Sequence, residues 1–105
     1  MSSDKKQLFN FLDERAFKPV LDADPDDYSG DKRKKLEDVQ RATRSERKRY
    51  ENYGSGQELY RMFEDDLNSE PAQQIHRELK DLGLPTLNDI RGEFEKKAKA
   101  AGVTS

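Results

Sequence analysis

The spacing of the apolar residues is the feature that most constrains the fold of this chain. Over residues 4–16 and in four later segments, apolar side chains recur every three or four positions rather than at every second position. An α-helix completes a turn in about 3.6 residues, so this spacing places them on one face of a helix. The β-branched residues that favour strands are scarce, with three Val and two Ile among 105 residues. The pattern predicts an all-α protein: a small single-domain bundle of about five short-to-medium helices that spans residues 1–105.

Helix-breaking residues divide the chain into these five segments. Proline disfavours the helical conformation of the residue before it, so the first helix is expected to end near residue 18, ahead of Pro19. Residues 22–30 are mostly acids and turn formers, and they are predicted to form an acidic loop before the second helix, at about residues 31–52. Ser55 and Ser69 are suitable N-caps for the third and fourth helices.

The connection between the fourth and fifth helices carries clear local signals. Gly83 is expected to end the fourth helix, and Thr86 with Asp89 three residues later approximates a capping box that starts the fifth. Residues 79–86 also look similar to the middle of the SAP motif, a helix–extension–helix element that binds DNA in the family bearing it. This resemblance covers eight residues of 105, and the downstream Gly and Lys of that motif are absent. Residues 103–105 are expected to fray.

One stripe of the long second helix has apolar residues at its ends and polar residues at its centre. We call this stripe the seam, and its residues are spaced at alternating steps of three and four: Leu36, Val39, Thr43, Glu46, Tyr50 and Tyr53. Thr43 and Glu46 stand where a dimerising coiled coil needs Leu or Ile, so we expect a monomer. The two ends of the seam are expected to be buried and its centre to face solvent. Arg44 and Arg47, near the centre, are then expected to be surface residues whose replacement leaves stability nearly unchanged.

Positive charge is concentrated in this same helix. The chain has 20 basic and 22 acidic residues, whereas residues 31–50 carry nine basic and four acidic side chains, a net charge of +5. The nine basic residues are candidate partner-binding residues: Lys32, Arg33, Lys34, Lys35, Arg41, Arg44, Arg47, Lys48 and Arg49. We interpret the chain as a protein-interaction or regulatory module that recognises an acidic protein surface through this helix.

Two alternatives stay open for the basic helix. One is a nucleic-acid-binding protein that uses the same cations for phosphate contacts, with Tyr50 or Tyr53 as a stacking surface. The other is a purely structural pairing of the helix with its own acidic neighbours, such as Glu37 with Arg41. The structural alternative is favoured over nucleic acid because the whole chain has a net charge of −2, whereas nucleic-acid-binding domains are usually basic.

Catalytic, metal and membrane signals are weak or absent in the sequence. The chain has no Cys and a single His, His76, which excludes thiolate and His-rich metal sites, so we expect no metal and no cofactor. Residues 22–26 begin like a calcium loop, but Asp27 and Arg33 stand where that loop needs Gly and Glu. No nucleotide-binding or hydrolase motif is present, and so few apolar residues leave little room for a pocket of ~300 Å³ or more, so we expect a protein that is not an enzyme. No segment approaches the ~18 apolar residues of a membrane span, so we expect a cytoplasmic protein without membrane contact.

Overall fold

Helices joined by short turns make up the part of the chain that the computed structural model describes, residues 3–52 and 54–104. The α-helices are α1 (Ser3–Leu12), α2 (Lys18–Leu21), α3 (Gly30–Asn52), α4 (Gly56–Leu67), α5 (Glu70–Asp81) and α6 (Arg91–Ala100). A π-helical turn (Asp13–Phe17) joins α1 to α2 without a break, so these two form one rod. The described residues therefore form five helical rods and no strand, which confirms the prediction of a small all-α bundle.

The first rod continues through Pro19, so the prediction that it ends near residue 18 is wrong. The reason is the π-helical turn directly before the proline, in which the Lys18 N–H donates to the carbonyl of Asp13, five residues earlier. A proline in an α-helix lacks the N–H of the normal bond and crowds the carbonyl four residues back. Because the wider turn places Pro19 within the first turn of α2, the helix does not need the missing N–H there.

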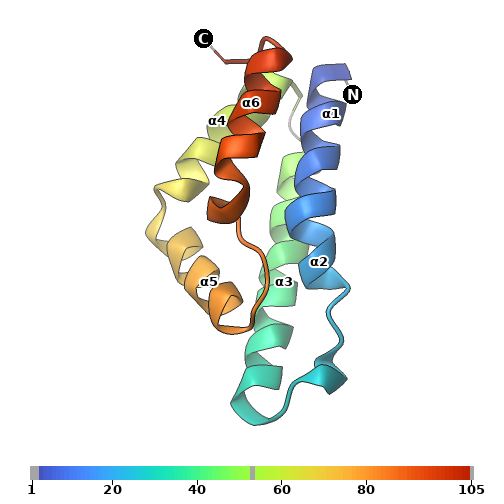
Figure 1. Ribbon diagram of the computed structural model, residues 1–105, viewed down its shortest axis with the longest axis vertical. Helices are drawn as coiled ribbons and strands as arrows, with labels where there is room; N and C mark the ends of the chain where they lie inside the picture. Colours follow the sequence, from blue (N-terminus) through green and yellow to red (C-terminus); the bar gives the residue numbers. More distant parts are fainter. Residues whose placement is uncertain (1–2, 53, 105) are drawn as a thin grey trace.

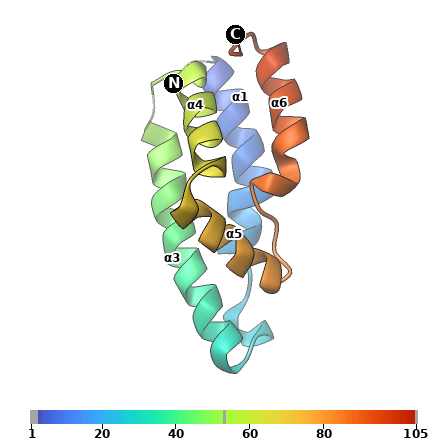
Figure 2. The ribbon, with the colours of Figure 1, turned by 90° about the vertical axis from the view of Figure 1, so that its left-hand side faces the viewer.

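The rods form an elongated bundle that measures 45 × 23 × 19 Å (Figure 1). The rod of α1 and α2 lies beside α3, which runs in the opposite direction along the molecule (Figure 2). At the upper end of Figure 1, α4 and α6 pack against α1. At the lower end, α5 packs against α3, which at 23 residues is about 34 Å long and extends beyond its neighbours.

The apolar side chains form two separate cores. The upper core lies between α1, α4, α6 and the end of α3, around the fully buried Tyr50, Phe63 and Phe94. The ring centroids of Phe63 and Phe94 lie 4.2 Å apart. The lower core is smaller and consists of five buried residues from α2, α3 and the end of α5: Val20, Leu36, Val39, Leu79 and Leu82.

Polar side chains fix the lower end of the bundle. The Gln40 side-chain amide of α3 donates to the carbonyls of Val20 and Ala23, at 3.1 and 2.9 Å. The Tyr28 hydroxyl, in the loop before α3, donates to the carbonyl of Leu82 at 2.8 Å. The Gln40 bonds hold the first half of α3 against the end of α2, and the Tyr28 bond holds the loop before α3 against the end of α5. The loop itself contains a short 3₁₀ turn, Pro25–Asp27.

The connection between α5 and α6 has the predicted caps. Gly83 adopts φ +76°, the left-handed conformation that favours glycine, and the Leu84 N–H then donates to the Leu79 carbonyl at 2.9 Å. The Thr86 N–H donates to the Asp89 carboxylate at 3.0 Å, and the Asp89 N–H donates to Thr86 Oγ1 at 3.3 Å, which is the reciprocal pattern of a capping box. A 3₁₀ turn (Asn88–Ile90) leads from this cap into α6.

The other predicted helix ends have mixed outcomes. Ser55 Oγ accepts the Glu58 N–H at 3.1 Å and caps α4, as predicted, whereas the Ser69 side chain makes no capping bond at the start of α5. Fraying was expected at residues 103–105, but Val103 is buried and its N–H donates to the Ala98 carbonyl at 3.0 Å. Ser105 lies outside the described residues. Within the described ranges, no helix has the length and apolar character required to cross a membrane.

Candidate functional site

Two of the nine candidate cations on α3 are bound within the protein. Arg47 donates through Nε and Nη2 to the carboxylate of Asp13 at 2.7 and 3.1 Å, and Asp13 is only 6% exposed. Arg49 Nη2 donates to both carboxylate oxygens of Asp66, at 3.0 and 3.1 Å. The interpretation of Arg47 as a surface residue without structural role is therefore wrong, because its guanidinium is the closest cation to a buried carboxylate.

The other seven cations form either weak, exposed ion pairs or no ion pair within the described part of the chain. Arg33 lies 3.4 Å from Asp26 and Arg41 lies 3.6 Å from Asp38, and all four side chains are largely solvent-exposed, so these ion pairs contribute little. Five cations have no ion-pair partner within 4 Å in the described part of the chain: Lys32, Lys34, Lys35, Arg44 and Lys48.

Four exposed cations share the side of α3 that is opposite its buried residues. We call them the outward face of α3: Lys34, Arg41, Arg44 and Lys48. Their steps of seven, three and four residues keep them on one side of a helix, over about 21 Å of its length. The buried residues on the other side of α3 are Leu36, Val39, Gln40, Thr43 and Tyr50.

The centre of the α3 seam is not solvent-facing, which contradicts the prediction from its polarity. Thr43 is only 3% exposed, because α5 and the chain before α6 cover it. Glu46 is partly buried and lines a cleft. The predicted burial at the ends of the seam is confirmed at Leu36, Val39 and Tyr50, whereas Tyr53 lies outside the described residues.

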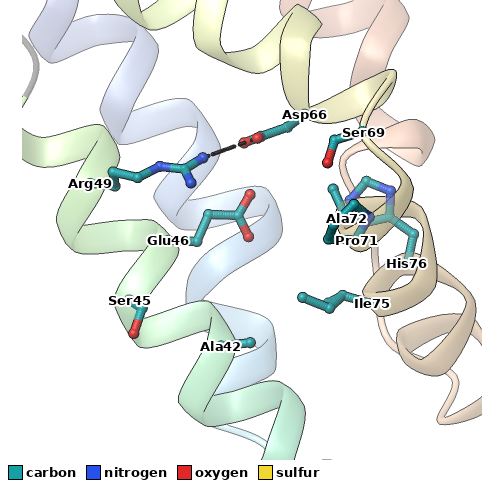
Figure 3. Close-up of a pocket in the computed structure, with 10 residues that line it drawn as sticks. All are labelled: Ala42, Ser45, Glu46, Arg49, Asp66, Ser69, Pro71, Ala72, Ile75 and His76. Carbon is teal, nitrogen blue, oxygen red and sulfur yellow. Dashed lines mark hydrogen bonds and ion pairs between the residues drawn. The ribbon is translucent and has the colours of Figure 1, made fainter.

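The cleft lies between α3 and α5 and has a volume of about 310 Å³. Figure 3 shows that its residues come from α3 on one side and from the end of α4, the α4–α5 junction and α5 on the other. One wall is apolar and the rest is polar. The lining residues are Ala42, Ser45, Glu46, Arg49, Asp66, Ser69, Pro71, Ala72, Ile75 and His76. The expectation that so few apolar residues leave little room for a pocket of ~300 Å³ is therefore wrong, because the cleft forms between two helices and has a partly polar lining.

Two carboxyl groups, those of Glu46 and Asp66, form the polar end of the cleft. Asp66 accepts the Tyr50 hydroxyl at 2.7 Å as well as the Arg49 guanidinium. The pKa of Glu46 is raised to about 8, chiefly by burial and also by the neighbouring negative charge of Asp66, while the positive charge of Arg49 opposes the shift. With a pKa of about 8, Glu46 is mostly protonated at pH 7.

Two further groups near the carboxyl pair, the His76 imidazole and the Tyr50 hydroxyl, are uncharged at pH 7. Burial lowers the pKa of His76, which is only 6% exposed. Burial also raises the pKa of the Tyr50 hydroxyl, and the charge of Asp66 adds to this shift. Asp66 and Arg49 are then the two charged groups among the residues that line the cleft, and they neutralise each other.

Sequence reasoning missed the carboxyl pair for a physical reason. Asp66 is one of three adjacent acids on α4, and it shares the apolar face with Leu59, Met62 and Phe63, which lie seven, four and three positions before it. That spacing was a usable signal that Asp66 points inward, but it does not reveal that Glu46 of α3 faces it. In the described ranges, no group of three or more acidic or His side chains is placed to hold a metal ion. No family model, curated protein or solved structure matches this chain.

Proposed function

We propose that the protein is a non-enzymatic interaction module that binds an acidic surface of a protein partner through the outward face of α3. The observation that supports this proposal is that the exposed cations of the outward face form no strong ion pair within the protein. Lys34, Arg44 and Lys48 have no ion-pair partner in the described part of the chain, and Arg41 has a weak, exposed one. A row of exposed charges of one sign speeds association with a complementary surface.

The arrangement of acids near these cations favours a protein partner over nucleic acid. Glu37 and Asp38 are exposed on the same helix, so a continuous phosphate backbone along α3 would be placed close to like charges. Tyr50, which was considered as a stacking surface for bases, is fully buried. A protein surface, with discrete acidic and basic side chains, can match such a mixed pattern. Because the apolar side of α3 is covered by the chain itself, we propose that the module acts as a monomer.

Affinity capture with a matched pair of variants tests this function. The first variant carries Lys34→Gln, Arg44→Gln and Lys48→Gln on the outward face. The control variant removes three exposed charges elsewhere, at Lys80, Lys96 and Lys99, none of which has an ion-pair partner in the described ranges. Each protein is immobilised and exposed to nuclease-treated and untreated lysate of its native cells, and the retained material is identified by mass spectrometry.

The proposal predicts one partner protein that the wild type and the control variant retain and that the outward-face variant loses, with or without nuclease. Its association rate with the purified wild type should fall as salt is raised from 50 to 300 mM. Retention that disappears after nuclease treatment would assign the helix to nucleic acid. Equal retention by the two variants would show that the outward face is not the binding surface.

A further inference from the structure

The cleft between α3 and α5 presents an apolar surface to solvent. Its apolar lining residues come from both helices: Ala42 from α3, and Pro71, Ala72 and Ile75 from α5. Figure 3 shows Ile75 projecting from α5 toward α3. These side chains are half-buried or exposed, so each keeps some contact with water. An apolar side chain of a ligand that entered this cleft of about 310 Å³ would remove apolar surface from water on both sides.

The carboxyl groups at the polar end of the cleft do not exclude a ligand that carries acids. The charge of Asp66 is balanced by the guanidinium of Arg49, which lies 3.0 Å from it. The Glu46 carboxyl, with its raised pKa, is mostly uncharged at pH 7. A side chain that enters along Ala72 and Ile75 therefore meets no net charge there.

The outward face of α3 borders the mouth of this cleft. Ser45 is exposed and lines the cleft, and it follows Arg41 by four positions and precedes Lys48 by three. Residues three or four positions apart are neighbours on a helix, so these two cations flank the cleft on its α3 side. Seven residues separate them, which is about 10.5 Å along the helix axis. The apolar surface therefore has basic surroundings, which favour an apolar side chain with acids near it.

An acidic helix matches this spacing. An acid three positions before an apolar residue and another four positions after it lie on the same side of a helix as that residue. The two acids are then also seven residues, or about 10.5 Å, apart. Two packed helices commonly cross at about 20°, so such a helix can follow α3 over this distance. Its acids then reach Arg41 and Lys48 while its apolar residue lies at the cleft, as in other helices that bind in grooves.

We propose that the cleft is the anchor site for a helix of the acidic partner, which inserts one apolar side chain beside Ile75. Acids on the same helix contact Arg41 and Lys48. This inference rests on the proposed function, to which it adds a helical partner with an apolar anchor residue. The cations speed association, whereas the anchor slows dissociation, because a few buried anchor residues dominate the affinity of protein interfaces.

NMR titration of the full chain with two designed peptides tests this inference. The first is a lactam-bridged helix of about 15 residues, because unbridged helices of this length are marginal in water. It carries one leucine, with a glutamate three positions before it and another four positions after it, on a background of alanine and glutamine. In the second peptide alanine replaces the leucine.

The leucine peptide should bind saturably at the cleft. The Ile75 methyl resonance and the amide resonances of residues 41–48 should shift, while the methyl of Ile90, buried in the upper core, stays in place. The alanine peptide should bind about tenfold more weakly, because it lacks the anchor. No saturable shift with the leucine peptide, or equal affinities of the two peptides, would overturn the inference.

Two variants fill the cleft from opposite walls. Ala42→Gln and Ala72→Gln each place a longer side chain in the cleft, and neither alanine belongs to one of the two cores. Each variant should bind the leucine peptide no better than the alanine peptide. The matched control, Ala100→Gln at an exposed position of α6, should keep the preference for leucine. An unchanged Ile90 methyl resonance identifies a folded variant, and either folded variant is sufficient for the test.

The outward-face variant separates this inference from the proposed function. That variant should weaken both peptides and still prefer leucine. If the wild type binds both peptides equally and the outward-face variant loses both, the anchor site is overturned and the proposed function stands. If the outward-face variant binds the leucine peptide as tightly as the wild type does, both are overturned.

Two other occupants of the cleft would give different results. Tighter binding of hexanoate than of the leucine peptide would assign the cleft to a small amphipathic acid. A shift of the Ile75 methyl resonance when the protein alone is diluted would assign it to a second copy of the chain. Either result would overturn the partner helix as the occupant.

Discussion

Replacement of Glu46 by glutamine is expected to stabilise the protein at neutral and alkaline pH. In the folded protein the pKa of Glu46 is raised to about 8, chiefly by burial and also by the neighbouring Asp66. In the unfolded chain the pKa of a glutamate is about 4.3. The folded state therefore keeps a proton that the unfolded state has lost over the whole range between these values, and holding it costs stability as the pH rises.

The size of this effect follows from the two pKa values. Below about pH 4.3 the carboxyl is protonated in both states and the free energy of unfolding does not depend on it. Between about pH 4.3 and pH 8, each pH unit lowers the free energy of unfolding by about 1.4 kcal/mol, and above pH 8 the loss is complete. The total loss is roughly 3–5 kcal/mol, a large part of the ~5–15 kcal/mol that stabilises a domain.

Urea denaturation followed by circular dichroism at 222 nm measures the effect. Between pH 6.5 and pH 8.5 the wild type should lose about 2 kcal/mol of unfolding free energy through this group. His76 opposes this loss slightly near pH 6.5–7, because its pKa is lowered in the folded protein while the unfolded imidazole, with a pKa near ~6.5, still binds part of a proton there. The Glu46→Gln variant should be nearly independent of pH in this window and more stable than the wild type at pH 8.5.

The control is Glu64→Gln, which removes an exposed carboxylate from α4 and should keep the wild-type slope. The reasoning is refuted if Glu46→Gln keeps that slope as well. It is also refuted if this variant is less stable than the wild type at pH 8.5, because Glu46 would then be ionised and favourably paired in the folded protein.

Three further predictions concern stability measured by the same urea assay. Arg47→Gln should lower the free energy of unfolding by roughly 1–3 kcal/mol because it removes the main partner of the buried Asp13 carboxylate, whereas Arg44→Gln should change it by less than ~0.5 kcal/mol. Equal effects of the two substitutions would contradict the conclusion that Arg47 is bound within the protein and Arg44 is not. Gly83→Ala should cost about 1–2 kcal/mol because of its left-handed backbone, whereas Gly92→Ala in α6, where an added Cβ meets no atom within 4 Å, should stabilise by about 0.5 kcal/mol. Tyr50→Phe should cost about 1–3 kcal/mol, since its buried hydroxyl bonds a carboxylate; no loss would mean that this bond does not contribute.

Features of the fold that depend on neighbouring residues could be predicted from the sequence. The end of α5 at Gly83 and the cap formed by Thr86 and Asp89 need only residues within one turn of each other, and the structure has both. The apolar spacing predicts the five rods for the same reason. The rule that a helix ends before a proline failed at Pro19, because a π-helical turn precedes it. That turn depends on how the whole rod packs.

The candidate site depended on contacts that no local pattern encodes. The polarity of Thr43 suggested solvent exposure, but a small hydroxyl side chain tolerates burial when another helix covers it, and here α5 does so. Arg44 and Arg47 look alike in the sequence, yet only Arg47 meets a buried carboxylate, that of Asp13, 34 residues earlier in the chain. Glu46 and Asp66 likewise come together only through the packing of α3 against α4 and α5.

The division of the apolar side chains into two cores has a consequence for how the molecule opens. The lower core contains five buried residues, whereas the upper core contains sixteen, among them the stacked aromatic rings. Local unfolding occurs most readily in the parts of a protein that bury the fewest apolar contacts. Backbone amides of α5 and of the first half of α3 should therefore exchange with deuterium through an opening that leaves α1, α4 and α6 folded. The cleft between α3 and α5 borders this weaker half, so the same opening should also change the shape of the cleft.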